Sequence, residues 1–448
     1  MNAYPVETIC AVATAAGRAG VGVVRISGPE ARAIITRLTG VEPHPRHAHY
    51  VTLKRSADQS VLDDGIVLYF PGPHSYTGED AVEWQGHGNP VLLDAAVEEM
   101  IGCGARMARP GEFTERAFLN GRMDLAQAEA VADLIEAGST QAAAAARRSL
   151  TGVFSNRVDA FVEHLIHLRM YIEAALDFPE EEIDFLSDTR LHDQLVELRA
   201  ELVELLGRTG EGVRLREGLQ LVIVGQPNVG KSSLLNQLAG ESRAIVTEIA
   251  GTTRDVVRAE IMLEGLPIHV IDTAGLRETE DPIEQEGIRR GWEEVERADL
   301  VMLVIDGMRG RSTEDEATLS RLPDKPLLTV INKVDLTGES ASEAVDDGTV
   351  RVSARTGAGI DALRAQLRHL AGVSDRAEDV FIARRRHLEA LKRAEQSLSE
   401  AADSLALGAG ELAAESLRRA QMAMEAITGR YTADDLLGEI FSSFCIGK

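Results

Sequence analysis

The chain has 448 residues, is 44% hydrophobic and carries a formal net charge of −25. This length predicts roughly three domains of ordinary size, and the hydrophobic fraction argues against disorder of the whole chain. The acidic balance disfavours non-specific nucleic-acid binding, because phosphate contacts need clustered lysine and arginine. Any nucleic-acid role therefore requires a local basic patch or a basic partner.

The three cysteines, Cys10, Cys103 and Cys445, are widely spaced and form no Cys-x-x-Cys motif. This spacing excludes a disulfide framework or an obvious zinc site, and it suits a reducing cytosol. The first residues show no basic region followed by an apolar core, so we expect no signal peptide. No apolar run approaches the ~20 residues of a membrane span. We therefore expect a cytoplasmic protein without membrane association.

The region 1–120 shows mixed strand and helix patterns, separated by glycine and proline. The expected strands are Ile9–Thr14, Gly22–Ile26, Tyr50–Leu53, Gly65–Phe70 and Ala81–Gln85, and the expected helices are Pro29–Leu38 and Pro90–Ile101. Between two glycines stands His87, which is either a ligand or base, or an ordinary loop histidine. The pattern predicts an α/β domain.

From 121 to 215 the pattern becomes helical. The expected helices are Asp124–Glu136, Gln141–Leu150, Val153–Leu176 and Leu191–Leu206. Within the second helix, Ala142–Ala146 present very small side chains, which favour close helix packing. The acidic stretch 177–184 is either a cation site or a solvated loop between helices.

The region 216–373 alternates strand and helix, as in a parallel sheet with crossover helices, and helices resume over 374–448. Those helices are expected at Glu378–Ala401, Glu411–Thr428 and Ala433–Phe444. We therefore expect a discontinuous all-α domain, made of 121–215 and 374–448, with an α/β domain inserted into it. The basic cluster Ala383–His387 either contacts nucleic acid or pairs with neighbouring acidic residues.

The inserted region opens with the apolar strand Leu219–Val224, the loop Gly225–Ser233 and a helical pattern. Strand, glycine-rich loop and helix are the context of a phosphate-binding P-loop. Its glycines let backbone amides converge on one anion, and the helix N-terminus adds positive potential. We expect Lys231 to reach the β- and γ-phosphates and Ser232 to ligate Mg²⁺.

Three further motifs follow in the order and spacing of a GTPase: Thr247–Thr253, Asp272–Gly275 and Asn332–Asp335. The first can complete Mg²⁺ coordination, and the second can contact Mg²⁺ and the γ-phosphate. In the third, Asp335 can accept two hydrogen bonds from guanine and so reject adenine. A backbone amide of Ser353–Arg355 can meet guanine O6. These motifs predict a Ras-like P-loop GTPase domain.

The expected GTP-binding residues are Asn228, Val229, Gly230, Lys231, Ser232, Ser233, Thr247, Glu248, Ile249, Ala250, Gly251, Thr252, Thr253, Asp272, Thr273, Ala274, Gly275, Asn332, Lys333, Asp335, Ser353, Ala354 and Arg355.

One position departs from Ras-type enzymes, which carry a water-positioning glutamine directly after Asp-x-x-Gly. Here Leu276 occupies it and cannot orient water. The candidates for that role are Glu284 and the nearby acids Glu278, Glu280 and Asp281. No arginine is recognisable as a finger. Asn228, with carbonyls of 247–252, can hold a monovalent cation against the phosphates, or it is an ordinary loop asparagine.

Several motifs together resemble the MnmE (TrmE) family of tRNA-modification GTPases. They are Gly225–Ser233, Ile249–Asp255, Asp272–Arg277, Gly78–Asp80, Gly86–Gly88, Arg109–Phe113 and the terminal Phe441–Lys448. The likeness spans the whole chain, including the insertion of the GTPase domain, and the terminal motif is the most distinctive.

The resemblance implies an N-terminal domain over 1–120 that dimerises and binds a one-carbon tetrahydrofolate, in the 5,10-methylene or 5-formyl form. It implies a helical domain over 121–215 and 374–448 and a TrmE-type G domain over 216–373. It also implies a homodimer that joins the FAD-dependent MnmG (GidA) protein in a heterotetramer or larger complex. Together they would add a carboxymethylaminomethyl or aminomethyl group at C5 of the tRNA wobble uridine.

Motif matching to this family assigns further roles, including potassium-stimulated hydrolysis. Mg²⁺ would be held by Ser232 and Thr253, and K⁺ by Asn228, Thr247, Ile249 and Thr252. The catalytic set would be Glu284, Lys231 and Cys445, and the folate contacts Arg25, Glu83, Arg122 and Lys448. At 122 the family's familiar residue is lysine, so Arg122 keeps the charge but changes the hydrogen-bond geometry. Cys445 is either a nucleophile toward uracil or a small thiol near the folate.

A second function class stays open from the residues alone. The chain can be a regulatory GTP switch that assembles tRNA or ribosome partners without chemistry of its own. Such a switch would not need the folate residues or the Phe-Cys-Ile-Gly-Lys tail.

Overall fold

The computed structural model describes residues 7–177, 189–239, 257–263, 265–272, 289, 292–322, 325–342, 348–372, 380–430, 434–442, 444 and 446–447. The chain forms two compact units. The first unit comprises residues 1–132, 150–182 and 404–448, and the second comprises residues 133–149 and 183–403.

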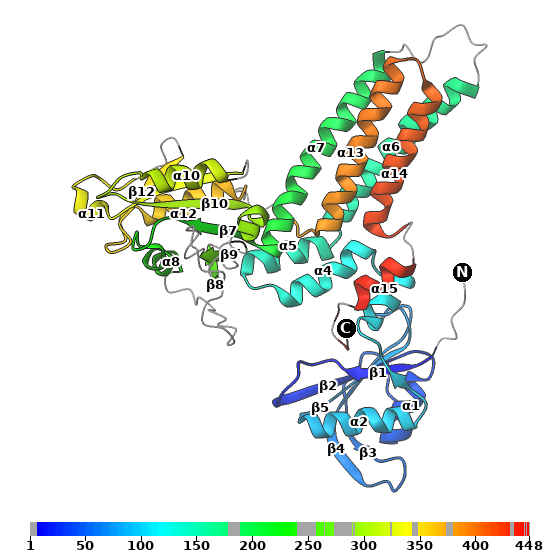
Figure 1. The fold of residues 1–448 in the computed structure, drawn as a ribbon. Helices are drawn as coiled ribbons and strands as arrows, with labels where there is room; N and C mark the ends of the chain where they lie inside the picture. Colours follow the sequence, from blue (N-terminus) through cyan, green and yellow to red (C-terminus); the bar gives the residue numbers. More distant parts are fainter. Residues whose placement is uncertain are drawn as a thin grey trace. The chain divides into compact units, whose positions relative to one another are not determined.

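The first unit contains a six-stranded sheet in the order β3-β4-β5-β2-β1-β6, of which Figure 1 labels β1 to β5. All its pairings are antiparallel except that of β1 with β6. The strands are β1 (Ile9–Val12), β2 (Ala19–Ser27), β3 (His49–Lys54), β4 (Val61–Phe70), β5 (Ala81–Gly88) and β6 (Arg106–Met107). All five strands predicted for this region are confirmed.

Two helices, α1 (Ala31–Thr39) and α2 (Pro90–Gly102), cover one face of this sheet. Alternate strand residues such as Val24, Ile26 and Trp84 are fully buried beneath them. Because successive strand residues point to opposite faces, Arg25 projects from the other face. The alternation therefore separates the hydrophobic core from the face that carries the predicted folate residues.

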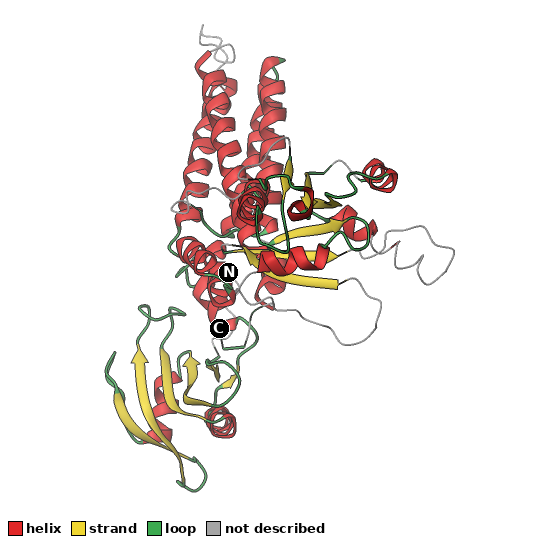
Figure 2. Ribbon diagram, turned by 90° about the vertical axis from the view of Figure 1, so that its left-hand side faces the viewer, coloured by secondary structure: helices red, strands yellow, loops and turns green. Residues whose placement is uncertain are grey.

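The remaining helices of the first unit are α3 (Glu112–Leu119), α4 (Leu125–Glu136, whose last turn lies in the second unit), α6 (Val153–Asp177), α14 (Gly410–Thr428) and α15 (Asp434–Ser442). The long helices α6 and α14 lie side by side (Figure 2), and Arg169 Nη1 donates to Gln421 Oε1 at 2.6 Å. Segments more than 200 residues apart thus form one helical layer. Helix α3 was not predicted.

The second unit contains another six-stranded sheet, in the order β12-β11-β10-β7-β9-β8, with only β8 antiparallel among its described pairings. Its strands are β7 (Leu219–Val224), β8 (Val257–Leu263), β9 (Leu266–Asp272), β10 (Leu300–Asp306), β11 (Leu327–Asn332) and β12 (Thr349–Arg351). The helices of this α/β part are α8 (Lys231–Ala239), α10 (Thr313–Arg321), α11 (Val334–Thr337) and α12 (Ile360–Leu370). Because β7, β10 and β11 are parallel, their carboxyl ends meet at one edge.

Three further helices belong to the second unit: α5 (Thr140–Leu150), α7 (Thr189–Glu217) and most of α13 (Arg385–Ala406). Helix α7 continues beyond the predicted end at 206, and α13 begins later than the predicted 378. The small face of α5 packs against the sheet, because Ala142 and Ala146 share a core with Ile261 and Leu266. The same core also contains Leu215 of α7, so the expectation of close helix packing for this face stays a prediction.

The ends of the inserted α/β part lie close together, as an insertion requires. Arg214 Nη2 donates to Gly372 O at 3.4 Å, and Arg385 pairs with Glu217 at 3.0 Å. Arg384 pairs with the buried carboxylate of Asp133 at 2.9 Å. The basic cluster is thus engaged in ion pairs, which favours the second of its two interpretations. No described helix is long and apolar enough to cross a membrane.

Candidate functional site

The phosphate loop joins β7 to α8 at the carboxyl edge of the second sheet. Gly225 and Gly230 have φ angles of 148° and 99°, in the region that favours glycine. A Cβ on Gly225 would collide with Val304 O, and one on Gly230 would collide with Asn332 Nδ2. Only glycine fits at these positions, because the loop is pressed against the ends of β10 and β11.

Lys231 is nine-tenths buried at the start of α8. Its Nζ donates to Gly225 O at 2.8 Å and to Gln226 O at 3.3 Å. A buried ammonium must be hydrogen-bonded, and here the loop carbonyls accept its protons. The neighbouring side chains of Ser232 and Ser233 are exposed in the first turn of α8. An ammonium, two hydroxyls and a helix N-terminus fit a phosphate group with its Mg²⁺.

Asn332 ties two loops of the site together at the end of β11. Its Nδ2 donates to Val229 O at 2.8 Å, and its Oδ1 accepts from the Ala354 amide at 2.9 Å. The side chain is buried, so both bonds lie out of water. Asn332 therefore links the phosphate loop to the segment 353–355 and fixes their relative position. The Ala354 amide, one candidate for guanine O6, already donates to Asn332.

Lys333 follows Asn332 with a φ of 69° and spans the site. Its Nζ donates at 2.7 Å both to Asn228 O and to Asp306 Oδ2. Burial raises the pKa of the Asp306 carboxyl, but hydrogen bonds from Lys333 and the Met308 amide outweigh it, so the pKa lies below its usual value. Sequence analysis missed Asp306. The signal that could have identified it is an acidic residue at the end of a fully buried strand, β10.

Asp335 is held by polar contacts of both carboxylate oxygens. Its Oδ1 accepts from Ser353 Oγ at 2.7 Å, and its Oδ2 lies 3.3 Å from Arg355 Nε. The Asp335 side chain is 13% exposed, whereas that of Arg355 is 77% exposed. The arginine can therefore move aside for a base, while Ser353 holds the carboxylate in place.

Other predicted residues lie outside the described part of the chain. They are Thr247, Glu248, Ile249, Ala250, Gly251, Thr252, Thr253, Thr273, Ala274, Gly275, Glu284, Cys445 and Lys448. The backbone of Asp272 ends β9, where its register partner is Ile223 of β7. The second motif thus leaves the sheet beside the strand that leads into the phosphate loop.

The first unit brings together two of the predicted folate residues. Arg25 of β2 and Glu83 of β5 are register partners, and the guanidinium donates to Glu83 Oε1 at 2.9 and 3.0 Å. The guanidinium also lies over the rings of Tyr76 and Phe113, at 5.4 and 5.7 Å from their centroids. Such stacking orients a cation. Both charged side chains remain about one-fifth exposed and accessible to a ligand.

The C-terminal tail docks beside this pair. Gly447 is buried with a φ of 95°, and a Cβ there would collide with Val12 O of β1. Since Ala11 is the register partner of Arg25, the tail ends next to the strand pair that carries the arginine. Arg122 is exposed, and its stem lies against Gly78 in the loop before β5. No described contact joins Arg122 to Arg25.

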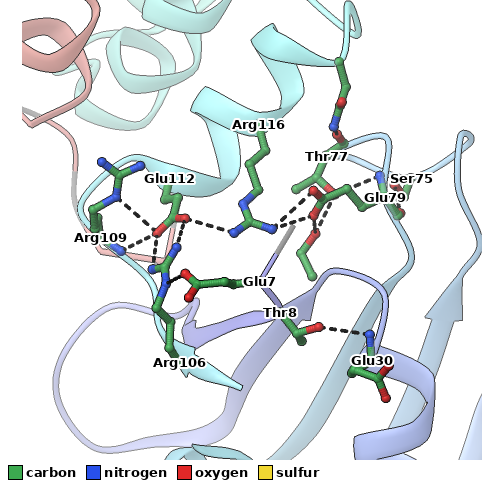
Figure 3. A network of polar contacts seen from close by, with 12 residues as sticks. Glu7, Thr8, Glu30, Ser75, Thr77, Glu79, Arg106, Arg109, Glu112 and Arg116 are labelled. Carbon is green, nitrogen blue, oxygen red and sulfur yellow. Dashed lines mark hydrogen bonds and ion pairs between the residues drawn. The ribbon is translucent and has the colours of Figure 1, made fainter. Parts of the chain in front are cut away.

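A network of ion pairs holds this region together (Figure 3). Glu112, at the start of α3, accepts from Arg106 Nη2 at 2.6 Å and from Arg116 Nη2 at 3.0 Å. Arg116 also pairs with Glu79 at 2.9 Å. Burial raises the pKa of Glu112, but the two guanidinium groups and the Arg109 amide outweigh burial and lower the pKa to about 2. The motif Arg109–Phe113 therefore contains the buried carboxylate of Glu112, whose ion pairs hold the start of α3 in place.

We expect Glu112→Gln to lower the free energy of unfolding of this region by about 3 kcal/mol at pH 7, because it leaves two guanidinium groups without their buried carboxylate. Since the folded pKa is depressed, this stability is present above the unfolded pKa of ~4.3 and is lost as the pH falls toward 2. Urea unfolding followed by Trp84 fluorescence in a Trp292→Phe background measures it. Glu115→Gln, which removes a carboxylate paired with the exposed Arg109, is the control. Equal midpoints for the two variants at pH 7 would contradict the prediction.

Comparisons with known proteins match the whole chain. The family described as the GTP-binding protein TrmE N-terminus matches residues 8–122, and the MnmE helical domain matches residues 125–445. The tRNA modification GTPase MnmE of Stutzerimonas stutzeri is 54% identical over 451 residues, covering 99% of each chain. Proteins of the same name from Pseudomonas syringae pv. tomato and Marinobacter nauticus are 54% and 53% identical, again over 99% of each chain.

Proposed function

Because the chain belongs to the MnmE (TrmE) family of tRNA modification GTPases, we propose that it couples potassium-stimulated GTP hydrolysis to folate-dependent modification of tRNA. With an FAD-dependent MnmG (GidA) partner, it adds a carboxymethylaminomethyl or aminomethyl group at C5 of the wobble uridine. The protein acts as a homodimer. The observation that carries the folate half of this proposal is the packing of Gly447 against β1, beside the Arg25–Glu83 pair.

The nucleotide half rests on the loop geometry. Lys231 lies where it can neutralise phosphate oxygens, and Asp335 is held ready for guanine by Ser353. Ser232, with Thr253 of the loop 247–253, would hold Mg²⁺. When bound, this cation supplies positive charge to the β- and γ-phosphates. Glu284 would position the attacking water, since Leu276 cannot.

Asn228 supports a potassium ion as the second cation. Its side chain is exposed, its φ is 64°, and its carbonyl is anchored by Lys333 at 2.7 Å. The Asn228 side chain is thus accessible to a cation, while its backbone is held in place by Lys333. Carbonyl and amide oxygens suit such a cation, and its charge does the electrostatic work of an arginine finger.

We expect GTP hydrolysis by the wild-type protein to be several-fold faster in KCl than in NaCl of equal concentration. In Asn228→Ala the two rates should become equal, because the cation loses a ligand. Steady-state hydrolysis in matched salts is the measurement, and Asn236→Ala, which alters an exposed asparagine of α8, is the control. A salt preference that survives Asn228→Ala would exclude this residue from the cation site.

In the proposed folate site, positively charged side chains bind the anionic glutamyl end of the ligand. Arg25, Arg122 and Lys448 supply those charges, and Glu83 pairs with the N–H groups of the pterin. Because Glu83 uses one carboxylate oxygen, Oε1, for Arg25, its Oε2 is available to a ligand.

We expect Arg25→Ala, and a chain that ends at Phe444, to lose binding of 5-formyltetrahydrofolate while keeping GTP hydrolysis. A charge-assisted hydrogen bond contributes about 1.5–3 kcal/mol, which corresponds to a loss of roughly ten- to a hundredfold in affinity. Calorimetry on the full-length protein measures it. Arg37→Ala, on α1 at the other face of the sheet, is the matched control. Unchanged affinity in both variants would exclude Arg25 and the C-terminal residues from the folate site, whereas no folate binding to the wild-type protein would leave a regulatory GTP switch as the better account.

A further inference from the structure

The motif Gly86–Gly88 takes no part in the sites described above, yet the structure builds a definite arrangement around its histidine. The ring of His87, on β5, is 71% exposed, and its Nδ1 lies 2.7 Å from Asp63 Oδ1 of β4. The backbone amide of His87 donates to the other oxygen of the same carboxylate at 2.9 Å. One aspartate therefore holds both the backbone and the ring of this histidine.

Asp63 is itself fixed. Its side chain is 8% exposed, and its Oδ1 also accepts from the Asp64 amide at 2.9 Å. Burial raises the pKa of Asp63, but hydrogen bonds from the His87 amide and ring and the Asp64 amide outweigh it and hold the pKa below its usual value. The carboxylate is thus ionised at neutral pH, so the facing Nδ1 must carry a proton. In the neutral ring, Nε2 then offers its lone pair to solvent.

The two glycines are required by the same arrangement. A Cβ on Gly86 would stand 2.7 Å from Asp63 Oδ2 and would strike the Trp84 ring. A Cβ on Gly88 would stand 2.6 Å from Ala19 O. Side chains are excluded on both sides of His87, while its own ring projects into solvent. If Asp63 only capped the end of β5, the hydrogen bond from the His87 backbone amide would be sufficient. Its carboxylate also orients the exposed ring of His87.

Strand β5 also carries Glu83, which pairs with Arg25 in the proposed folate site. Strand alternation places Glu83 and His87 on one side of β5, since Trp84 and Gly86, which alternate between them, are buried. Four residues of strand separate the two by roughly 13 Å. An exposed ring at this distance is open to a macromolecule that approaches the folate.

We propose that His87 is a catalytic base of the tRNA modification, oriented by Asp63; this rests on the proposed function. When the methylene carbon of a 5,10-methylenetetrahydrofolate is joined to C5 of the uridine, the C5–C bond forms as the bond from that carbon to N10 breaks, and the electron pair of the C–N bond stays on N10, which takes a proton from water. The C5–H bond then breaks: its electron pair stays with the pyrimidine ring, and its proton passes to Nε2 of His87. The imidazolium that forms is stabilised by the Asp63 carboxylate and returns its proton to water.

The test uses the full-length protein with its MnmG partner, tRNA, GTP and reduced folate. We expect His87→Gln to slow modification by about a hundredfold or more, which is the typical contribution of a general base. GTP hydrolysis and 5-formyltetrahydrofolate affinity should not change, and the acid limb of the rate–pH profile should disappear. His47→Gln, which alters another exposed histidine of the same sheet domain, should behave as wild type.

The outcomes separate this proposal from the function on which it rests. If the wild-type protein binds no reduced folate, the proposed function fails. If it binds and modifies, and His87→Gln modifies tRNA at the wild-type rate, the role of His87 is overturned. If His87→Gln also loses folate binding, the rate–pH profile of Asp63→Asn distinguishes a catalytic role of His87 from a structural one. A base that loses its counter-charge shifts the acid limb to lower pH, whereas a purely structural loss lowers the rate equally at every pH and overturns the proposal.

Discussion

Lys231→Ala is expected to lower the rate of GTP hydrolysis by roughly 10²–10³-fold or more, the loss seen when one preorganised donor to a developing charge is removed. In the structure its ammonium is buried against Gly225 O and Gln226 O. The charge is therefore held in place before the nucleotide binds, and little reorganisation is needed as charge develops on the phosphates. Single-turnover hydrolysis at saturating GTP measures the effect on the chemical step.

The control for this variant is Lys325→Ala. Lys325 also donates to two backbone carbonyls, those of Glu296 and Ala298, but it precedes β11 and so lies at the opposite end of the sheet. We expect hydrolysis close to wild type in this variant. Retained turnover in Lys231→Ala at saturating nucleotide would count against the assignment of the phosphate site.

Asp335→Asn is expected to weaken GTP binding by roughly a hundredfold, because a buried polar site rejects a ligand whose hydrogen-bonding groups it cannot match. The amide would place N–H groups against the N1–H and 2-amino groups of guanine. Xanthine carries a carbonyl oxygen in place of the 2-amino group, so xanthosine triphosphate should bind the variant better than GTP does. Fluorescence titration of the wild type and the variant with GTP and with xanthosine triphosphate measures the affinity for each nucleotide.

Asp361→Asn provides the comparison for this second variant. Asp361 is 98% exposed on α12, where it pairs with Arg364 at 3.3 Å. Exposed pairs of this kind contribute little, so nucleotide binding should be unchanged. If Asp335→Asn kept the affinity and the base preference of wild type, the carboxylate would not be the group that reads guanine.

The GTPase fold could be predicted from the sequence because each of its motifs is locally encoded. The loop Gly225–Ser233 can be recognised by its glycines, which lie between an apolar strand and a helix. Parallel strands then bring the motifs at their carboxyl ends to one edge. The partners inside the site were not predictable. Asn332 ties Val229 to Ala354, and Lys333 pairs with Asp306. These contacts depend on how separate loops close on one another, with partners 22 to 103 residues apart in the chain.

Boundaries were less predictable than the elements themselves. Helix α7 runs on to Glu217, and α13 begins only at Arg385, because residues 380–382 bond to α5 instead. Ser149 Oγ and Arg148 Nε donate to carbonyls of that segment, Ile382 O and Val380 O. Such long-range bonds override local helix preference.

By itself, the sequence determined most of the strands and helices of the first unit, the GTPase fold and the family. These follow from periodicity and from residues close in the chain, whose physical roles are local. Only the tertiary structure decided that Asp63 holds His87, that α5 packs on the sheet, and that Gly447 lies against β1. Each of these joins segments that are not neighbours in the chain: a buried charge for Asp63, small apolar side chains for α5 and close backbone approach for Gly447. Such pairings depend on which surfaces meet when the chain closes, and no local pattern encodes that.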